Sequence, residues 1–312
     1  MDSRSQPSVA RCPACGGDAP PRRPATDHRA RHNAVRYTLQ ACPACDLQFW
    51  TPLVADPSVY EGEGFEAYAD YHEGRRPFPR WAEPLFALDL VPGRSLDVGC
   101  GDGAVPARLS GIGFEAHGLD QDARSIRVAR DKYGLDTVQA LPLQAFVAES
   151  LAAGRRFDLV TFFEVLEHQD APREFLALVA RIARPGAQIA GSVPARDRFL
   201  AGLDRRMNEG DLPPHHFLWF SPRALRSLLV AAGLVDVEVR RAGGMGYAEV
   251  MRRIGALVVR RTRPLPLPLA WPLRGLAALS APLFALPVWL GLRRRPSHLF
   301  FLARTPEGAE RA

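Results

Sequence analysis

Ser95-Leu-Asp-Val-Gly-Cys-Gly-Asp-Gly103 is the stretch that decides the fold. A short apolar strand runs into three glycines at alternate positions, and a helical pattern begins at Ala104. Glycines are needed because the chain turns sharply there and a ligand must approach bare backbone. Gly99, Gly101 and Ala104 also satisfy the dinucleotide fingerprint G-x-G-x-x-A. Asp97 favours a different ligand, because a carboxylate inside the strand is poorly placed beside a pyrophosphate but would attract a cationic sulfonium.

A second motif, Phe157-Asp-Leu-Val-Thr-Phe-Phe-Glu-Val-Leu-Glu-His168, lies downstream, where no second nucleotide-binding half occurs. With the glycine turn and a final strand pattern at 298–304, it resembles the class I S-adenosylmethionine-dependent methyltransferases. The branch that it resembles most includes ubiquinone-biosynthesis O-methyltransferases and many sugar and natural-product methyltransferases. The resemblance covers roughly residues 93–240 and returns at 298–304. It implies an α/β fold, a Rossmann-like seven-stranded sheet with helices on both faces, and S-adenosylmethionine as the cofactor.

The pattern from residue 93 onward alternates strands and helices as a parallel sheet requires. Strands are expected at 95–98, 114–119, 136–139, 157–163, 187–193 and 235–240. Helices are expected at 104–111, 123–133, 143–151, 172–183 and 222–232. A seventh strand, antiparallel beside the sixth, is expected at 297–304.

Five parts of the chain follow from these patterns. They are a zinc-ribbon-like module at 1–55, a linker with an aromatic cap helix at 56–92, the methyltransferase core at 93–243, a hydrophobic insertion at 244–296, and the final strand and tail at 297–312. In the linker, Phe65, Tyr68, Tyr71 and His72 recur at helical spacing. Tyr71 or His72 could reach the ligand, although simple packing on the core is the favoured interpretation.

The resemblance implies the cofactor contacts residue by residue. The expected set is Asp97, Gly99, Gly101, Gly103, Asp120, Gln139, Ala140, Leu141, Phe163 and Glu164. Within it, Asp97 would lie at the methionine and sulfonium end, and Asp120 would accept both ribose hydroxyls. Gln139 is a departure, because many relatives carry an aspartate near this position beside the adenine. A glutamine carbonyl can still accept from the adenine amino group, without charge assistance.

The general base is expected in Pro213-Pro-His-His-Phe-Leu-Trp-Phe-Ser221, where this family builds its acceptor pocket. Histidine titrates near neutrality, as a proton acceptor for a hydroxyl should. His215 and His216 are therefore the leading candidates, and His168 is the third. For each of them, a hydrogen bond within the loop is the competing interpretation.

Glu164, Glu167 and His168 form the pattern E-x-x-E-H. Positions i, i+3 and i+4 share one face of a helix or turn, so two carboxylates and an imidazole could hold a divalent ion. The favoured alternative is that Glu164 contacts the cofactor region while Glu167 and His168 hold the local turn.

Four of the five cysteines form two identical knuckles, Cys12-Pro-Ala-Cys15 and Cys42-Pro-Ala-Cys45. Two thiolates on each of two turns make a tetrahedral site suited to zinc. Four thiolates leave no open position, so the zinc would be structural and would supply a large share of the module's folding energy. Redox or disulfide pairs are less favoured, because no signal peptide opens the chain and cytosolic thiols stay reduced. The module is expected to cap the substrate pocket, although arginines between the knuckles also suit nucleic acid.

The insertion between the sixth and seventh strands is apolar and flanked by basic residues. Residues 241–312 carry twelve arginines and three glutamates, a net charge of +9, so the first 240 residues are net −3 within the total of +6. The uncharged stretch 275–292 has eighteen residues, close to the ~20 of a transmembrane helix. Because the final strand returns to the same sheet, Pro282 and Pro287 favour a re-entrant segment or two interfacial helices. Peripheral contact with the cytoplasmic face of a membrane is the favoured prediction, and packing on the core or a dimer contact is the alternative.

The sequence therefore predicts a cytoplasmic methyltransferase whose acceptor is a sugar, a glycolipid or a prenylated small molecule, with methyl transfer at the membrane surface as the expected setting. The alternative is an RNA-modifying methyltransferase, or a non-catalytic cofactor-binding protein, that uses the ribbon and its arginines for nucleic acid. Nucleic acid is disfavoured, because residues 1–240 are net acidic and no Asn-Pro-Pro-Tyr-type motif for flipped bases occurs.

Overall fold

Seven strands form the central sheet, in the order β12-β13-β10-β9-β6-β7-β8. They are β6 (Arg94–Val98), β7 (Glu115–Asp120), β8 (Val138–Ala140), β9 (Phe157–Phe163), β10 (Ala183–Pro194), β12 (Val235–Ala242) and β13 (His298–Arg304). β13 runs antiparallel to both of its neighbours, β10 and β12, and the pairs from β10 to β8 are parallel. The computed structural model describes residues 9–24, 26–30, 33–55, 72–207, 209–264 and 266–308. The α/β fold with a seven-stranded sheet is thus confirmed.

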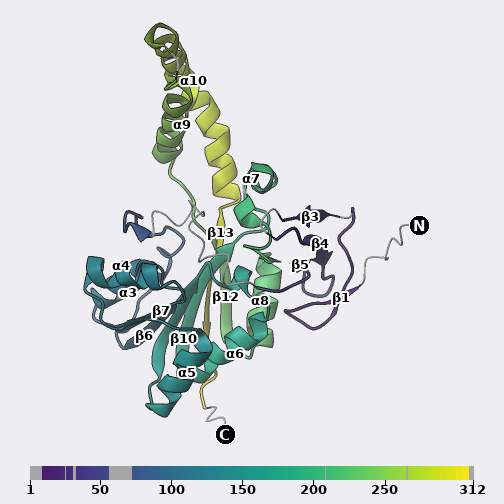
Figure 1. Cartoon of the computed structure of the whole chain (residues 1–312), viewed down its shortest axis with the longest axis vertical. Coiled ribbons are helices and arrows are strands. Elements are labelled where there is room, and N and C mark those ends of the chain that lie inside the picture. Colours follow the sequence, from purple (N-terminus) through teal and green to yellow (C-terminus); the bar gives the residue numbers. More distant parts are fainter. Residues whose placement is uncertain are drawn as a thin grey trace.

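Helices cover both faces of this sheet (Figure 1). They are α3 (Ala104–Ser110), α4 (Ala123–Tyr133), α5 (Leu143–Ala152), α6 (Pro172–Ile182) and α8 (Pro222–Ala231). Neighbouring strand residues serve opposite faces, as a period of two requires. Phe162 and Phe301 pack in one hydrophobic cluster with α5, α6 and α8, whereas Phe163 and Phe300 pack in another with α3. The near-continuous apolar runs in β9 and β13 therefore reflect burial on both faces.

Two helix ends follow the sequence signals closely. Asp122 caps α4 by accepting from the backbone N–H of Arg124, and Ser221 caps α8 by accepting from that of Ala224. β10 differs from its expected bounds, since it begins at Ala183 and its pairing with β9 is irregular between Ala183 and Gln188.

The N-terminal module is joined to the core by a shared sheet. Its strands are β1 (Ala10–Arg11), β2 (Asp18–Ala19), β3 (Asp27–Arg29), β4 (Arg36–Ala41) and β5 (Gln48–Thr51). β5 also pairs with β11 (Leu218–Trp219), so a four-stranded sheet runs in the order β11-β5-β4-β3. The module and the strand that follows the histidine pair are therefore one structural unit.

The described end of the linker, residues 72–92, packs on the α3 side of the sheet. Phe65, Tyr68 and Tyr71 of the expected cap helix lie outside the described residues. Downstream, the 3₁₀-helix η2 (Leu85–Ala87) buries Leu85 in the α3 cluster, with Phe78 and Trp81 packed against it.

The insertion forms a helical hairpin of α9 (Tyr247–Thr262) and α10 (Leu267–Arg294). Figure 1 shows this hairpin projecting away from the sheet, so its described residues do not cover the catalytic core. Among the described helices, none by itself has the length and apolar character to cross a membrane. The segments Pro268–Leu276 and Ala278–Arg294 meet that test only as a pair, bent by 44°.

Candidate active site and metal centre

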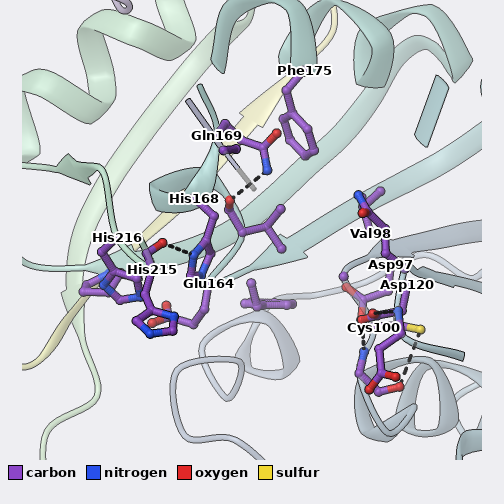
Figure 2. A pocket seen from close by; sticks show the side chains of 18 of the residues that line it. Asp97, Val98, Cys100, Asp120, Glu164, His168, Gln169, Phe175, His215 and His216 are labelled. Carbon is purple, nitrogen blue, oxygen red and sulfur yellow. Dashed lines mark hydrogen bonds between the residues drawn. The ribbon is translucent and has the colours of Figure 1, made fainter. Parts of the chain in front are cut away.

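A cavity of about 930 Å³ lies at the carboxyl ends of β6, β7 and β9. Of the predicted site residues, its lining contains Asp97, Gly99, Gly101, Asp120, Leu141, Phe163, Glu164, His168, His215 and His216. Figure 2 shows Asp97, Cys100 and Asp120 on one side and the histidines with Glu164 on the other. The volume lies within the ~300–1,000 Å³ that is usual for ligand pockets. The glycine side and the histidine side therefore share one cavity.

The glycine turn holds the carboxylate of Asp120 at the end of β7. Gly99 and Gly101 have φ angles of 75° and 53°, which favour glycine. A Cβ at Gly99 would also lie 2.5 Å from Val165 Cγ2. The backbone N–H of Gly101 donates to Asp120 Oδ2 over 2.9 Å, and that of Asp122 donates to Oδ1 over 2.9 Å. Each carboxylate oxygen keeps a second lone pair, so Asp120 can accept from a ligand diol.

Asp97 is a buried carboxylate in β6. Its side chain accepts a 2.6 Å hydrogen bond from Thr161 Oγ1, and the residue is only 2% exposed. Burial raises the pKa of Asp97 to about 7, and the charge of Asp120 acts in the same direction, against the hydrogen bond from Thr161. A cationic group in the cavity would stabilise this carboxylate. The residues present therefore fit the sulfonium and ammonium groups of the expected cofactor.

Three expected cofactor residues stand outside the described cavity lining. Gly103, with a φ of 81°, precedes α3, and a Cβ there would lie 2.6 Å from Ala129 Cβ on α4. The absence of a side chain at Gly103 thus allows α3 to pack closely against α4. Gln139 and Ala140 end β8, and Leu141, the residue after them, does line the cavity.

Trp81 is a cavity residue that the sequence analysis missed. Its ring stacks on Phe163 at a centroid distance of 5.4 Å, and the guanidinium of Arg76 lies 5.5 Å from its centre. All three residues line the cavity. Trp81, downstream of the expected cap helix, therefore contributes an aromatic wall to the cavity. By contrast His72 bonds to Asp122 Oδ2 at 2.6 Å and is not among the described lining residues.

Glu167, His168 and His216 converge on the opposite side. Glu167 and His168 belong to the 3₁₀-helix η3 (Leu166–His168), which follows β9. Nε2 of each histidine lies 4.0 Å from Glu167 Oε1, and the two rings meet edge to face at 4.7 Å. Glu167 is fully buried, and neither of its carboxylate oxygens has a hydrogen-bond partner among the residues that the structure describes. The three ligand atoms lie close enough together to hold a metal ion.

The tautomers of both histidines follow from their partners. His168 Nδ1 donates to the carbonyl oxygen of His215 over 2.6 Å, because a carbonyl can only accept. His216 Nδ1 lies 3.0 Å from Asp211 Oδ1. Although Asp211 is buried, its pKa is lowered because His216, Arg198 and Arg205 stabilise the carboxylate. Each Nε2 lone pair therefore faces Glu167, while His215 supplies its backbone carbonyl and lines the cavity.

Glu164 is held apart from this group, so the structure brings together a different set from the E-x-x-E-H residues considered as ion ligands. Its Oε1 accepts from Ser192 Oγ over 2.6 Å, and its Oε2 lies 3.1 Å from His298 Nε2. Burial would raise the pKa of Glu164, but His298 and Ser192 outweigh it and lower that pKa. A φ of 56° also places Glu164 in the left-handed region, a strain of about 1–3 kcal/mol that often marks functional sites. His216 takes the place that the E-x-x-E-H pattern gave to Glu164.

His298 was missed by the sequence analysis, although a signal for it exists. It is the first residue of β13, and β13 is antiparallel to the other strands. The amino end of an antiparallel strand lies at the carboxyl edge of its parallel neighbours, where ligands bind. Asp211 carried no such signal, because its role depends on contacts with Arg198, Arg205 and His216 that only the folded loop creates.

The four N-terminal cysteines form a separate cluster. Cys12 Sγ lies 3.5 Å from Cys45 Sγ, and Cys15 Sγ lies 3.5 Å from Cys42 Sγ. All four sulfurs lie within 4.8 Å of one another, and none is in a disulfide. Tetrahedral Zn–S bonds of ~2.3 Å place sulfurs roughly 3.8 Å apart, so the donor set fits a zinc ion.

The region that forms this cavity is similar to known proteins. A family model described as a methyltransferase domain matches residues 70–239. A ubiquinone biosynthesis O-methyltransferase of Burkholderia orbicola is 33% identical over 172 residues, 53% of this chain and 72% of the relative. The protein of the same description from Burkholderia thailandensis is 30% identical over 172 residues, 52% of this chain and 72% of the relative. The family match includes both sequence motifs and leaves out the cysteine module and the hairpin.

Two solved structures are similar at lower identity. A phosphoethanolamine-type N-methyltransferase of Haemonchus contortus, solved with phosphomonomethylethanolamine and S-adenosylhomocysteine, has a TM-score of 0.49 at 15% identity and covers 83% of this chain and 62% of that chain. A SAM-dependent methyltransferase from Archaeoglobus fulgidus has a TM-score of 0.46 at 15% identity and covers 72% of this chain and 91% of that chain.

Proposed function

The chain belongs to the methyltransferase-domain family, and from that premise we propose that it transfers a methyl group from S-adenosylmethionine to a hydroxyl of a small acceptor. The observation that carries the proposal is the cavity that joins the glycine turn to the histidine group. The descriptions of the relatives from Burkholderia favour oxygen as the methylated atom.

The glycine side of the cavity would bind and orient the cofactor. When bound, S-adenosylmethionine supplies an electrophilic methyl group on a sulfonium. Asp120 would accept the ribose hydroxyls, and Asp97 would stabilise the positive charge. The stacked pair of Trp81 and Phe163 would exclude water beside Glu164.

The histidine side would receive the proton that the acceptor hydroxyl loses. His216 is the base that the geometry favours, because Asp211 holds its Nδ1–H and leaves Nε2 as the acceptor. A carboxylate in this position also stabilises the imidazolium that forms, as in hydrolase triads. His168 has the same orientation, but burial and His216 lower the pKa of His168 to about 3, which makes it a weaker base. His215 would act through its carbonyl bond to His168 and as a wall of the pocket.

Binding of a divalent cation is a second candidate role for the same group, Glu167, His168 and His216. The observation that favours it is Glu167, because a buried carboxylate without a hydrogen bond is costly unless it is neutral or paired with a cation. A bound cation would supply Lewis-acid stabilisation of the acceptor oxygen. Calorimetric titration with Mn²⁺, compared between the wild-type protein and Glu167→Gln, separates the roles. Binding that Glu167→Gln abolishes supports the cation, and equal heats in both proteins leave the histidine base alone.

We also propose that the hairpin places the enzyme on the cytoplasmic face of a membrane, where a glycolipid or prenylated acceptor would be found. Leu276, Leu279 and Leu283 are 67%, 82% and 78% exposed. No charged residue occurs between Arg274 and Arg293. An apolar helix exposed to this degree favours a lipid environment, and the flanking arginines suit anionic headgroups.

A second copy of the chain is the competing partner for the hairpin. Leu269, Leu276, Leu283 and Leu290 recur every seven residues, as in a coiled coil. A soluble coiled coil, however, keeps polar residues on its outer face, whereas Phe284 and Leu286 are also exposed. Flotation with phosphatidylglycerol vesicles tests this choice. Leu279→Glu with Leu283→Glu should abolish flotation, while Ile112→Glu with Val230→Glu, two exposed sites on the body, should not. A monomer–dimer shift by light scattering without any flotation would contradict the membrane proposal.

The experiment that tests the activity uses labelled S-adenosylmethionine with host-cell extract, and Asp120→Ala as the control. Label in the organic-extractable or polysaccharide fraction supports the proposed acceptor classes. Label in the RNA fraction would instead favour the nucleic-acid alternative, and no label in any fraction would favour a non-catalytic cofactor-binding protein.

A further inference from the structure

The second cysteine knuckle is the turn that connects β4 to β5. Cys42 directly follows β4, which ends at Ala41, and Cys45 precedes β5, which begins at Gln48. β5 in turn pairs with β11 in the register Leu218 opposite Phe49 and Trp219 opposite Gln48. A metal at the four sulfurs would therefore hold the hairpin on which β11 is built.

Two arginines of the core bind the knuckle itself. Arg196 donates to the carbonyl oxygen of Asp46 over 2.6 Å and to both carboxylate oxygens of Asp46 at 3.1 and 2.9 Å. Arg223 donates to the carbonyl oxygen of Ala44 over 2.7 Å. Asp46 and Ala44 flank Cys45, so the two arginines hydrogen-bond directly to the metal-binding turn.

Phe217 connects this unit to the reactive group. Its backbone N–H donates to the carbonyl oxygen of Glu167 over 3.0 Å, and its carbonyl accepts from the N–H of Trp50 over 3.0 Å. One residue is thus bonded on one side to η3 of the active site and on the other to β5 of the module. Phe217 is 1% exposed, so water does not compete for these bonds.

Side chains support the same connection. The ring of Trp50 packs edge to face on Trp219 at 5.3 Å, and Tyr37 packs in the same way on Phe217 at 6.0 Å. His28 Nε2 donates to the carbonyl oxygen of Pro213 over 3.0 Å, two residues before His215. The segment that carries both histidines is therefore fixed to the module at each end.

We infer that the four-cysteine module, with zinc bound, is the positioning element of the acceptor side, and that His28 is a positioning residue within it. Loss of the metal would release β5, then β11 and Phe217, and with them Glu167 and the histidine pair. The glycine turn lies on β6 and β7 and would keep its geometry. This inference is independent of the proposed function, because it concerns how well the segments 164–168 and 212–220 are held in place and does not concern turnover.

Hydrogen exchange on the full-length protein tests the inference, before and after zinc is removed with a chelator. Exchange should increase in peptides covering 9–55, 212–220 and 164–168, while peptides covering 94–101 and 115–120 stay unchanged. Calorimetry with S-adenosylhomocysteine should give the same affinity in both states. Faster exchange confined to 9–55, or raised equally throughout the chain, would overturn the inference, because either result describes a cap that only contributes stability.

A variant series tests His28 without removing the metal. His28→Ala should raise exchange at 212–220 about fivefold, the effect of one lost part-buried hydrogen bond. His28→Gln, whose amide can donate to the Pro213 carbonyl, should restore most of the protection. Arg36→Ala is the matched control, since Arg36 bonds Asp27 on the exposed surface of the same sheet. Equal effects of His28→Ala and Arg36→Ala at 212–220 would reject His28 as a positioning residue.

Discussion

The two sides of the cavity are assembled in opposite ways. The glycine side is made by β6, its turn and the end of β7, so Asp97, Gly101 and Asp120 meet across one pair of neighbouring strands. The histidine side draws on η3, the loop before β11, the first residue of β13 and, through Phe217, the cysteine module. A site made by one turn can be recognised from a short motif, whereas a site made by distant segments depends on everything that fixes those segments.

The largest expected effect is on the glycine side. Asp120→Ala should remove the acceptor of the ribose hydroxyls and leave the N–H groups of Gly101 and Asp122 without partners. Two hydrogen bonds to a charged group are worth ~1.5–3 kcal/mol each, so the affinity for S-adenosylhomocysteine should fall by more than about a hundredfold. Calorimetry measures this affinity, with Asp131→Ala on α4 as the control. Micromolar affinity retained in Asp120→Ala would contradict the assignment of Asp120 as the acceptor of the ribose hydroxyls.

Substitutions on the histidine side should lower turnover rather than cofactor affinity. His216→Ala should reduce turnover by ~10²–10⁴, the usual contribution of a positioned base, and should leave the affinity for S-adenosylhomocysteine unchanged. Combining it with His215→Ala should add little, because His215 acts through its backbone carbonyl. Initial rates in the labelled-methyl assay provide the measurement. Unchanged turnover in the double variant would remove both histidines from the mechanism.

A smaller effect should appear in the pH dependence of cofactor binding. Burial raises the pKa of Asp97 to about 7 in the free protein, and a bound cation needs its ionised form. The affinity for S-adenosylmethionine should therefore be full above pH 7 and should fall below it, approaching tenfold per pH unit. Asp97→Asn should lose this dependence between pH 5 and 7.

S-adenosylhomocysteine is the matched control for that titration, because it lacks the sulfonium charge. Its affinity should fall less steeply over the same range. Equal slopes for the two ligands would show that Asp97 does not respond to the sulfonium.

The smallest effect tests a position where the resemblance and the structure diverge. Gln139 was expected at the adenine, but the described cavity lining includes Leu141 and Leu143 instead. Gln139→Ala should change the affinity for S-adenosylhomocysteine by less than about twofold, within the ±0.5 kcal/mol usual for substitutions away from a site. A loss of tenfold or more would return Gln139 to the adenine site.

Particular residues show where sequence reasoning reached its limit at the site. Phe157–Phe163 and Ala123–Tyr133 were expected with the bounds that the structure has, because apolar runs and caps are local signals. The pattern E-x-x-E-H was considered as an ion site, although the favoured interpretation separated Glu164 from Glu167 and His168; in the structure Glu164 bonds to His298, from a strand more than a hundred residues later. The spacing within the motif contains no information on this partner, which is indicated only by the place of His298 at the start of the antiparallel final strand.

The sequence by itself predicted an α/β fold, a glycine turn and two paired cysteine knuckles, since periodicity, glycine and Cys-x-x-Cys spacing act over a few residues. The methyltransferase family and its cofactor side came from the resemblance of the two motifs. The tertiary structure alone decided that His216 joins Glu167 and His168, that Asp211 orients His216, and that β5 supports the histidine segment through β11 and Phe217. The physical reason is distance along the chain. Backbone pairing and buried charge form only when remote segments pack, and their partners are chosen by the folded geometry rather than by neighbours in sequence.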